Sequence, residues 1–191
     1  MQDFTGLALS TPRLHLRPLH GDDVPALWAI FSDPEVMRYW STPPWTDPAR
    51  AQEMVDGDAL SLAAGEHLRL GIAARDSAEL IGTCSLFAFV PDSQRCEIGY
   101  ALARAHWGRG LMHEALLALV GFAFGTLALR RLEADIDPRN TASARALERL
   151  GFVREGFLRE RWRVGEQISD TALYGLLQRD WPAGLAAVAP T

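Results

Sequence analysis

The sequence predicts one domain of the α/β class, built on a mixed sheet. Its 191 residues suit a single domain, and 48% of them are hydrophobic, which is enough for one sizeable core. Segments that alternate apolar and polar residues occur both before and after segments whose apolar residues have helical spacing. Strands on both sides of helices along the chain are typical of a mixed sheet within one domain.

The first segments predict a strand followed by a helix. Residues 13–19 alternate apolar and polar side chains, which indicates a strand with one exposed face. Asp22 or Asp23 can then cap a helix that runs to Phe31. We expect the helix to end before Pro34, because a proline disfavours the helical conformation in the residue before it.

The middle of the chain predicts a loop, a second helix and three strands. Residues 39–45 are aromatic and rich in proline, which favours a loop. Asp47-Pro48 can start a helix, because proline suits the first helical position. Residues 68–74 and 80–90 predict two strands joined by a turn, and residues 96–103 predict a third.

The second half predicts two helices among three further strands. Residues 108–124 carry apolar side chains at helical spacing, and residues 132–136 form a short strand pattern. Residues 141–150 predict a helix that a glycine ends. Residues 152–164 and 170–177 predict two strands joined by a turn.

The composition excludes several classes of function. The formal net charge is −5, so no basic surplus is present to bind nucleic acid. Cys84 and Cys96 lie in apolar, strand-like segments and cannot build a disulfide framework. Residues 1–10 lack the features of a signal peptide, and no unbroken apolar run reaches the roughly 18 residues of a membrane span. We therefore expect a cytoplasmic protein that binds neither nucleic acid nor membranes.

The most informative segment is residues 97–115, which reads as a strand, a glycine-bearing turn and a helix. Gly108 and Gly110 allow backbone conformations that other residues avoid, and the first amides of the helix lack intrahelical partners. Such amides at the positive end of a helix can bind a pyrophosphate, and Arg109 adds a positive charge. A tight turn without a ligand remains the alternative. The segment is not a Walker loop, because it contains no Gly-Lys-Ser/Thr. It is not a dinucleotide fingerprint, because position 113 is His.

Trp107-Gly-Arg-Gly-Leu-Met112 resembles the acetyl-CoA pyrophosphate loop of the GNAT acetyltransferases, with Trp107 and Met112 departing from the usual residues. The loop and the Glu114-Ala115 that follows resemble the RimJ/RimL branch, which acetylates the N-termini of ribosomal proteins. Three further segments are similar to the same family in the same order, and the resemblance extends from about residue 11 to 181. They are residues 11–19, residues 137–143 with 147–152, and residues 151–156 with Asp170 and 174–181.

The resemblance implies one GNAT domain over residues 11–181, with a splayed sheet of about seven strands, and residues 1–10 and 182–191 as terminal extensions. It implies an acetyl-CoA-dependent N-acetyltransferase in which pantetheine pairs with backbone between Ile98 and Leu102. The pyrophosphate is then expected on the amides from Arg109 to Glu114. The implied contacts with acetyl-CoA are Ile98, Tyr100, Leu102, Trp107, Gly108, Arg109, Gly110, Leu111, Met112, His113, Asn140 and Ser143.

Glu97 is the candidate general base, because it is a carboxylate in an otherwise apolar strand. A partly exposed carboxylate at the start of a strand is the alternative. Asn140 either caps a helix or, as the resemblance implies, binds the pantetheine arm. Ser143 either protonates the leaving thiolate or caps the same helix. Many family members place a tyrosine acid four residues later, but here that position is Leu147.

The candidate acceptor site consists of aromatic side chains. Tyr39, Trp40, Trp45 and Tyr100 either line an acceptor cleft or cover core. No spacing of histidines and cysteines predicts a metal site. The resemblance favours a protein or peptide N-terminal amine as acceptor, attacking acetyl-CoA directly in a ternary complex. A small amine such as a polyamine, amino acid or antibiotic remains open, as does a non-catalytic acyl-CoA-binding module. Family members are often dimers, which leaves a homodimer open.

Overall fold

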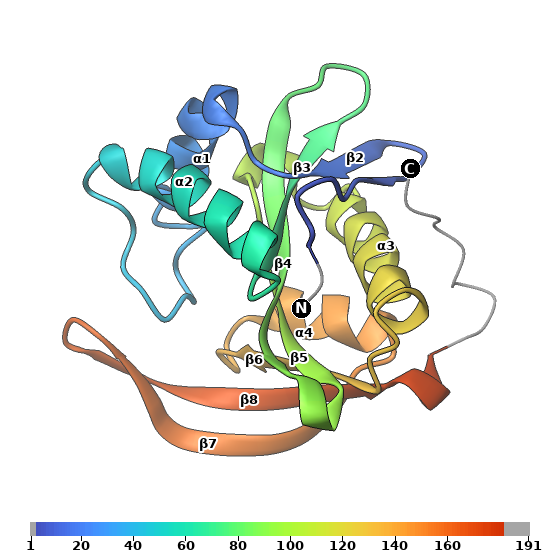
Figure 1. The fold of residues 1–191 in the computed structure, drawn as a ribbon. Helices are drawn as coiled ribbons and strands as arrows, with labels where there is room; N and C mark the ends of the chain where they lie inside the picture. Colours follow the sequence, from blue (N-terminus) through green and yellow to red (C-terminus); the bar gives the residue numbers. More distant parts are fainter. Residues whose placement is uncertain (1–2, 182–191) are drawn as a thin grey trace.

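The computed structural model describes residues 3–181, which form eight strands and four α-helices (Figure 1). Residues 182–191, predicted as a loose extension, lie outside the described residues, as do residues 1–2. The strands are β1 Leu9–Ser10, β2 Leu14–Arg17, β3 Leu68–Ala74, β4 Leu80–Val90, β5 Arg95–Leu102, β6 Arg131–Ile136, β7 Val153–Val164 and β8 Gln167–Leu177. The helices are α1 Val24–Phe31, α2 Ala49–Ala64, α3 Leu111–Gly125 and α4 Thr141–Arg149.

All the strands belong to one mixed sheet in the order β1-β2-β3-β4-β5-β6-β8-β7. Within the described residues, β5 and β6 form the one parallel pair, and every other neighbouring pair is antiparallel. The predicted α/β class is confirmed, with one strand more than expected. That strand, β1, has two residues, which is too short to produce an alternating pattern.

Helices cover both faces of the sheet. Apolar residues of α1 and α2 pack with Leu80 and Ala101 on one side of β4 and β5. Residues of α3 and α4 pack in a larger core on the other side, together with Cys96 and Ile98. Phe4, from the predicted N-terminal extension, is only 4% exposed and belongs to this larger core. None of the helices within residues 3–181 is long and apolar enough to span a membrane.

Two helix starts differ from the expectation. Asp23 stands at the N-cap of α1, but its carboxylate makes no capping bond to that helix. It instead accepts hydrogen bonds from the Arg17 guanidinium at 2.7 and 2.9 Å and from the His20 amide. The helix α3 begins at Leu111 and not at residue 108, because Gly108 and Gly110 both adopt the left-handed conformation.

Candidate active site

The sheet opens between its two parallel strands. β5 and β6 pair over only three residues, from Arg95 with Arg131 to Glu97 with Glu133. Beyond that point β5 continues to Leu102 and β6 to Ile136, and no further pairs connect them. Within residues 3–181, the splay therefore leaves one edge of β5 without a strand partner beyond Glu97.

The alternation along β5 determines which backbone groups face this opening. The Ala103 amide donates to the Ile81 carbonyl at 2.8 Å, so residue 103 faces the β4 side. The Leu102 carbonyl lies on the other side, where it accepts from Trp107 Nε1 at 2.7 Å. Because backbone groups alternate along a strand, Ile98 and Tyr100 also face the opening. Two of the three predicted backbone contacts on β5 are thus available, whereas the carbonyl of the third is bonded to the indole.

A cavity of about 790 Å³ passes through the region of the splay. Its walls come from both faces of the sheet, from the loop after α1 and from the β7–β8 hairpin. Residues that line it include Tyr39, Trp40, Glu97, Tyr100, Asp135, Asn140, Ser143 and Trp162.

Trp45, predicted as part of an acceptor wall, does not line this cavity. Its ring stacks on Phe31 with centroids 4.8 Å apart, and its side chain is 8% exposed within the core under α1 and α2. Trp40 meets Phe31 edge to face and stays partly exposed at the cavity. The aromatic pattern of this loop could not distinguish a core residue from a wall residue.

Glu97 lies on the side of the sheet that faces α1 and α2, since its side chain alternates with the buried Cys96 and Ile98. Among residues 3–181 its carboxylate has no ion-pair or hydrogen-bond partner. Burial raises the pKa of its carboxyl, and the nearby charges of Asp135 and Glu133 raise that pKa further. A carboxylate with a raised pKa inside a cavity can accept a proton from a substrate near neutral pH.

Asp135 is a second carboxylate in this cavity, and the sequence reasoning missed it. One of its oxygens accepts from Thr171 Oγ1 at 2.8 Å and from Trp162 Nε1 at 3.3 Å, and no cation pairs with it among the described residues. Glu133, by contrast, pairs with Arg95 at 2.6 Å and Arg131 at 2.7 Å. The signal was present, because acidic residues alternate with apolar ones along β6.

Ser143 meets Tyr100 on the other side of the opening, and Asn140 lies at the start of the same helix, α4. The Asn140 carboxamide oxygen accepts from the Ser143 amide at 3.1 Å, which is a helix cap. The hydroxyls of Ser143 and Tyr100 are 2.7 Å apart. Burial raises the pKa of Tyr100 to about 12, against the opposing effect of the Ser143 hydrogen bond. Leu147 is fully buried in the core, so the phenol nearest Ser143 comes from β5 and not from α4.

The predicted phosphate loop lies outside the cavity lining, at the start of α3. Gly108 has φ +72° and Gly110 has φ +74°, and a Cβ on Gly108 would meet no atom within 4 Å. The amides of residues 110–113 are the first four of the helix and have no intrahelical acceptor. We expected the Glu114 amide to bind the anion as well. This amide instead donates to the Gly110 carbonyl at 3.2 Å and is not free. Open space and four free amides at a helix N-terminus suit a pyrophosphate.

The side chains around this loop are mostly exposed. Trp107 is 46% exposed, and Arg109 Nη1 lies 3.4 Å from His106 Nδ1. His113 Nδ1 is buried without a hydrogen-bond partner among the described residues. No three potential metal ligands cluster anywhere within residues 3–181.

Known proteins are similar to this chain in sequence and in fold. Residues 13–153 match the family model of the acetyltransferase (GNAT) domain. The N-acetyltransferase p20 of Bacillus licheniformis is 37% identical over 91% of this chain and 97% of its own length. The [ribosomal protein uS5]-alanine N-acetyltransferase of Escherichia coli is 32% identical over 63% of this chain and 62% of its own.

Among solved structures, Mycobacterium smegmatis RimJ, determined with CoA-disulfide, superposes with a TM-score of 0.84 at 22% identity. The superposition covers 97% of this chain and 94% of RimJ. At that identity the RimJ structure shows a shared fold alone. The family model and the p20 relative show similarity of sequence. The chain therefore belongs to the GNAT acetyltransferases and is an acetyl-CoA-dependent N-acetyltransferase.

Proposed function

We propose that this acetyltransferase binds acetyl-CoA across the opening between β5 and β6 and transfers the acetyl group directly to the N-terminal amine of a protein or peptide. The observation that carries the proposal is the unpaired edge of β5 at Ile98 and Tyr100, together with the free amides of residues 110–113. The edge can pair with the amides of a pantetheine arm, and the loop can bind the pyrophosphate. Asn140 lies beside the same opening, at the start of α4.

Direct transfer is supported by the state of the two thiols. Cys84 and Cys96 are both buried, and burial raises the pKa of each to about 12. A thiol with such a pKa is almost entirely protonated at neutral pH and is a poor nucleophile. Neither cysteine is therefore suited to carry the acetyl group, and we assign the attack on the thioester to the acceptor amine itself.

The remaining roles follow from the two sides of the opening. On the α1 and α2 side, Glu97 accepts the proton that the acceptor ammonium must lose before its lone pair can attack. Asp135, which has no cationic partner among the described residues, binds the ammonium beside it. On the α4 side, the phenol of Tyr100 is protonated at neutral pH. It donates this proton to the departing thiolate, either directly or through the Ser143 hydroxyl. Holding both substrates in one cavity supplies much of the acceleration.

Two observations bear on the acceptor: the similarity to a known enzyme and the charge of the cavity. Similarity to the [ribosomal protein uS5]-alanine N-acetyltransferase favours a protein or peptide acceptor, and we propose its N-terminal amine. Glu97 and Asp135, neither of which pairs with a cation among residues 3–181, favour any acceptor with a positive charge, and a small polyamine is therefore the second candidate.

The experiment is a panel of N-terminal peptides and small amines, read by release of CoA. Peptides that begin with alanine or serine are expected to be acetylated at their α-amine, with a kcat/KM above that of spermidine and of free amino acids. A preference for spermidine by tenfold or more would favour the small-amine assignment. Tight CoA binding without turnover on any amine would indicate a binding module and would overturn the proposed reaction.

A further inference from the structure

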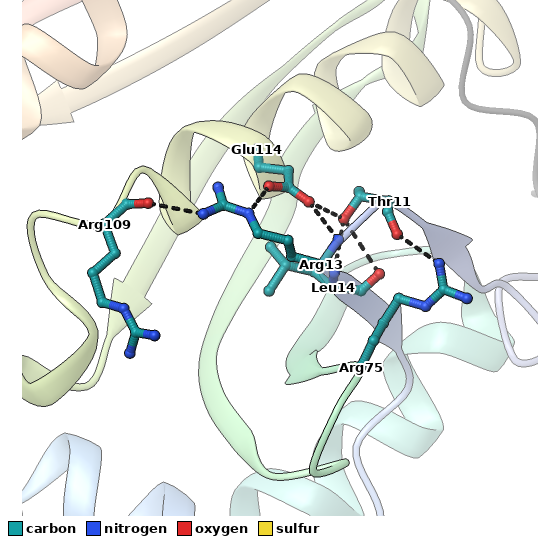
Figure 2. Close-up of polar contacts among 6 residues, drawn as sticks. All are labelled: Thr11, Arg13, Leu14, Arg75, Arg109 and Glu114. Carbon is teal, nitrogen blue, oxygen red and sulfur yellow. Dashed lines mark hydrogen bonds and ion pairs between the residues drawn. The ribbon is translucent and has the colours of Figure 1, made fainter.

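An arginine from the N-terminal segment reaches the loop that opens α3 (Figure 2). Arg13 Nη1 donates to the carbonyl oxygen of Arg109 at 3.0 Å, and its Nε donates to Oε2 of Glu114 at 2.6 Å. These contacts join residues that are 96 and 101 positions apart in the chain. A single guanidinium thus connects the loop to the first turn of α3.

The bond to the Arg109 carbonyl has a consequence for the next amide. In a trans peptide the C=O and the following N–H point in opposite directions. The bond that holds the Arg109 carbonyl toward Arg13 therefore holds the Gly110 N–H away from it. Gly110 has no Cβ and sits at φ +74°, so little else in its own structure opposes a rotation of this peptide. A rotated peptide would turn an oxygen, instead of an N–H, toward an anion bound at the loop.

Glu114 orients the arginine and is itself fully engaged. Its Oε1 accepts from Thr11 Oγ1 at 2.6 Å and from the Arg13 amide at 2.9 Å, and its Oε2 accepts from Arg13 Nε. Burial alone would raise the pKa of this carboxyl, but the hydrogen bonds from Thr11 and Arg13 outweigh burial and lower it. Glu114 therefore stays negative, with its charge directed at Arg13, although it lies near the helix end that would bind an anion.

We propose that Arg13 is a positioning residue that holds the Arg109–Gly110 peptide in the orientation that binds the pyrophosphate of CoA, with Glu114 fixing the guanidinium. The inference rests on the proposed function for the place of the pyrophosphate. Arg13 contributes in two ways: it directs the Gly110 amide toward the ligand, and it neutralises a carboxylate that would otherwise repel the phosphates.

The first test is Arg13→Gln, with CoA affinity measured by calorimetry. The Kd for CoA should rise roughly tenfold, the size of loss expected when one charge-assisted hydrogen bond is removed. S-acetylpantetheine lacks the pyrophosphate, so its KM should stay within about twofold of the wild-type value. The kcat at saturating acetyl-CoA should also be unchanged, because Arg13 does not line the cavity that contains Glu97 and Tyr100. An equal loss for both thioesters would indicate a general structural role and would overturn the assignment.

Arg75→Gln is the matched control. Arg75 Nη1 donates to the Thr11 carbonyl at 3.0 Å, so this variant removes an arginine hydrogen bond from the same N-terminal segment without touching the loop. Its Kd for CoA should equal that of the wild type. If Arg75→Gln raises the Kd for CoA as much as Arg13→Gln does, the loss of affinity comes from a disturbed N-terminal segment and not from the Arg109–Gly110 peptide.

Two further variants keep the test decisive. Arg13→Lys retains the charge beside Glu114 and the fold, but one ammonium lacks the planar fork that meets both partners, so the CoA Kd should still rise several-fold. Adding Glu114→Gln to Arg13→Gln should recover part of the lost affinity, since the uncompensated carboxylate is removed. A wild-type Kd in both Arg13 variants overturns this inference alone. A wild-type protein that binds no CoA overturns the proposed function as well.

Discussion

The phenol oxygen of Tyr100 lies 2.7 Å from the hydroxyl oxygen of Ser143, which joins the open edge of β5 to the first turn of α4. The two residues are 43 positions apart, and both line the cavity. Burial, the larger effect, raises the pKa of Tyr100 to about 12 despite the Ser143 hydrogen bond. The phenol therefore stays protonated throughout the neutral range, and we propose that it donates the proton in place of the tyrosine acid that Leu147 cannot provide.

Tyr100→Phe tests this role with almost no change in shape. If the phenol protonates the departing thiolate, kcat should fall roughly 10²-fold, at the low end for general acid catalysis because a thiolate is a good leaving group. The Kd for CoA should be nearly unchanged, since the backbone edge of β5 remains. Steady-state kinetics with calorimetry separates the two quantities. Wild-type kcat in Tyr100→Phe would assign the phenol a purely structural role.

Glu97→Gln keeps the shape of the side chain and removes its basicity. We expect kcat to fall roughly 10²- to 10⁴-fold with little change in CoA affinity. The deficit should shrink as pH rises, because more of the acceptor amine is then already neutral. A pH–rate profile on the best acceptor checks this expectation. A deficit that stays constant up to about pH 9.5 would mean that Glu97 orients the acceptor and does not deprotonate it.

Asp135→Asn changes the charge that faces Glu97 while the asparagine oxygen can still accept from Thr171. Glu97 must be deprotonated to act, so activity rises with pH through its pKa, and that pKa is raised by burial and then by Asp135. Removing the Asp135 charge should lower the pKa of Glu97 and move the acid limb of kcat/KM to lower pH. The KM for the amine should rise at the same time, since one anionic contact with the ammonium is lost.

Other charges also act on Glu97 and remain in that variant. Glu133 on β6 raises its pKa, whereas Arg95 on β5 and Arg161 on β7 lower it. Asp170→Asn is the control, because Asp170 lies on β8 and accepts from the Glu160 amide but does not line the cavity. It should leave the profile unchanged. An unchanged acid limb of kcat/KM in Asp135→Asn would contradict the proposed coupling between Asp135 and Glu97.

Asn140 has a structural role and a proposed binding role, and two substitutions separate them. Asn140→Ala removes the bond to the Ser143 amide and should cost about 1 kcal/mol of unfolding free energy. Asn140→Ser retains a good capping residue but shortens the side chain, so stability should be close to that of the wild type. If the carboxamide binds the pantetheine arm, both variants should weaken CoA. Wild-type CoA affinity in Asn140→Ser would show that Asn140 caps α4 and does not bind the pantetheine arm.

The order and class of the elements followed from the sequence because they depend on near neighbours. Apolar spacing along residues 111–125 is helical, and the alternation along β6 is that of a strand with one polar face. The left-handed glycines before α3 and the capping carboxamide of Asn140 are likewise local features. Local reasoning left Trp45 open between a cleft wall and the core, because its burial against Phe31 depends on where the loop after α1 folds back.

What the sequence by itself determined is the domain class, the strand, turn and helix of the proposed pyrophosphate site, and the candidate base Glu97. Only the tertiary structure decided that Asp135 faces the same cavity as Glu97, that Tyr100 meets Ser143, and that Arg13 reaches Glu114 across 101 residues. The reason is physical: strand register and the splay between β5 and β6 set which side chains meet, and both arise from packing of the whole sheet against its helices.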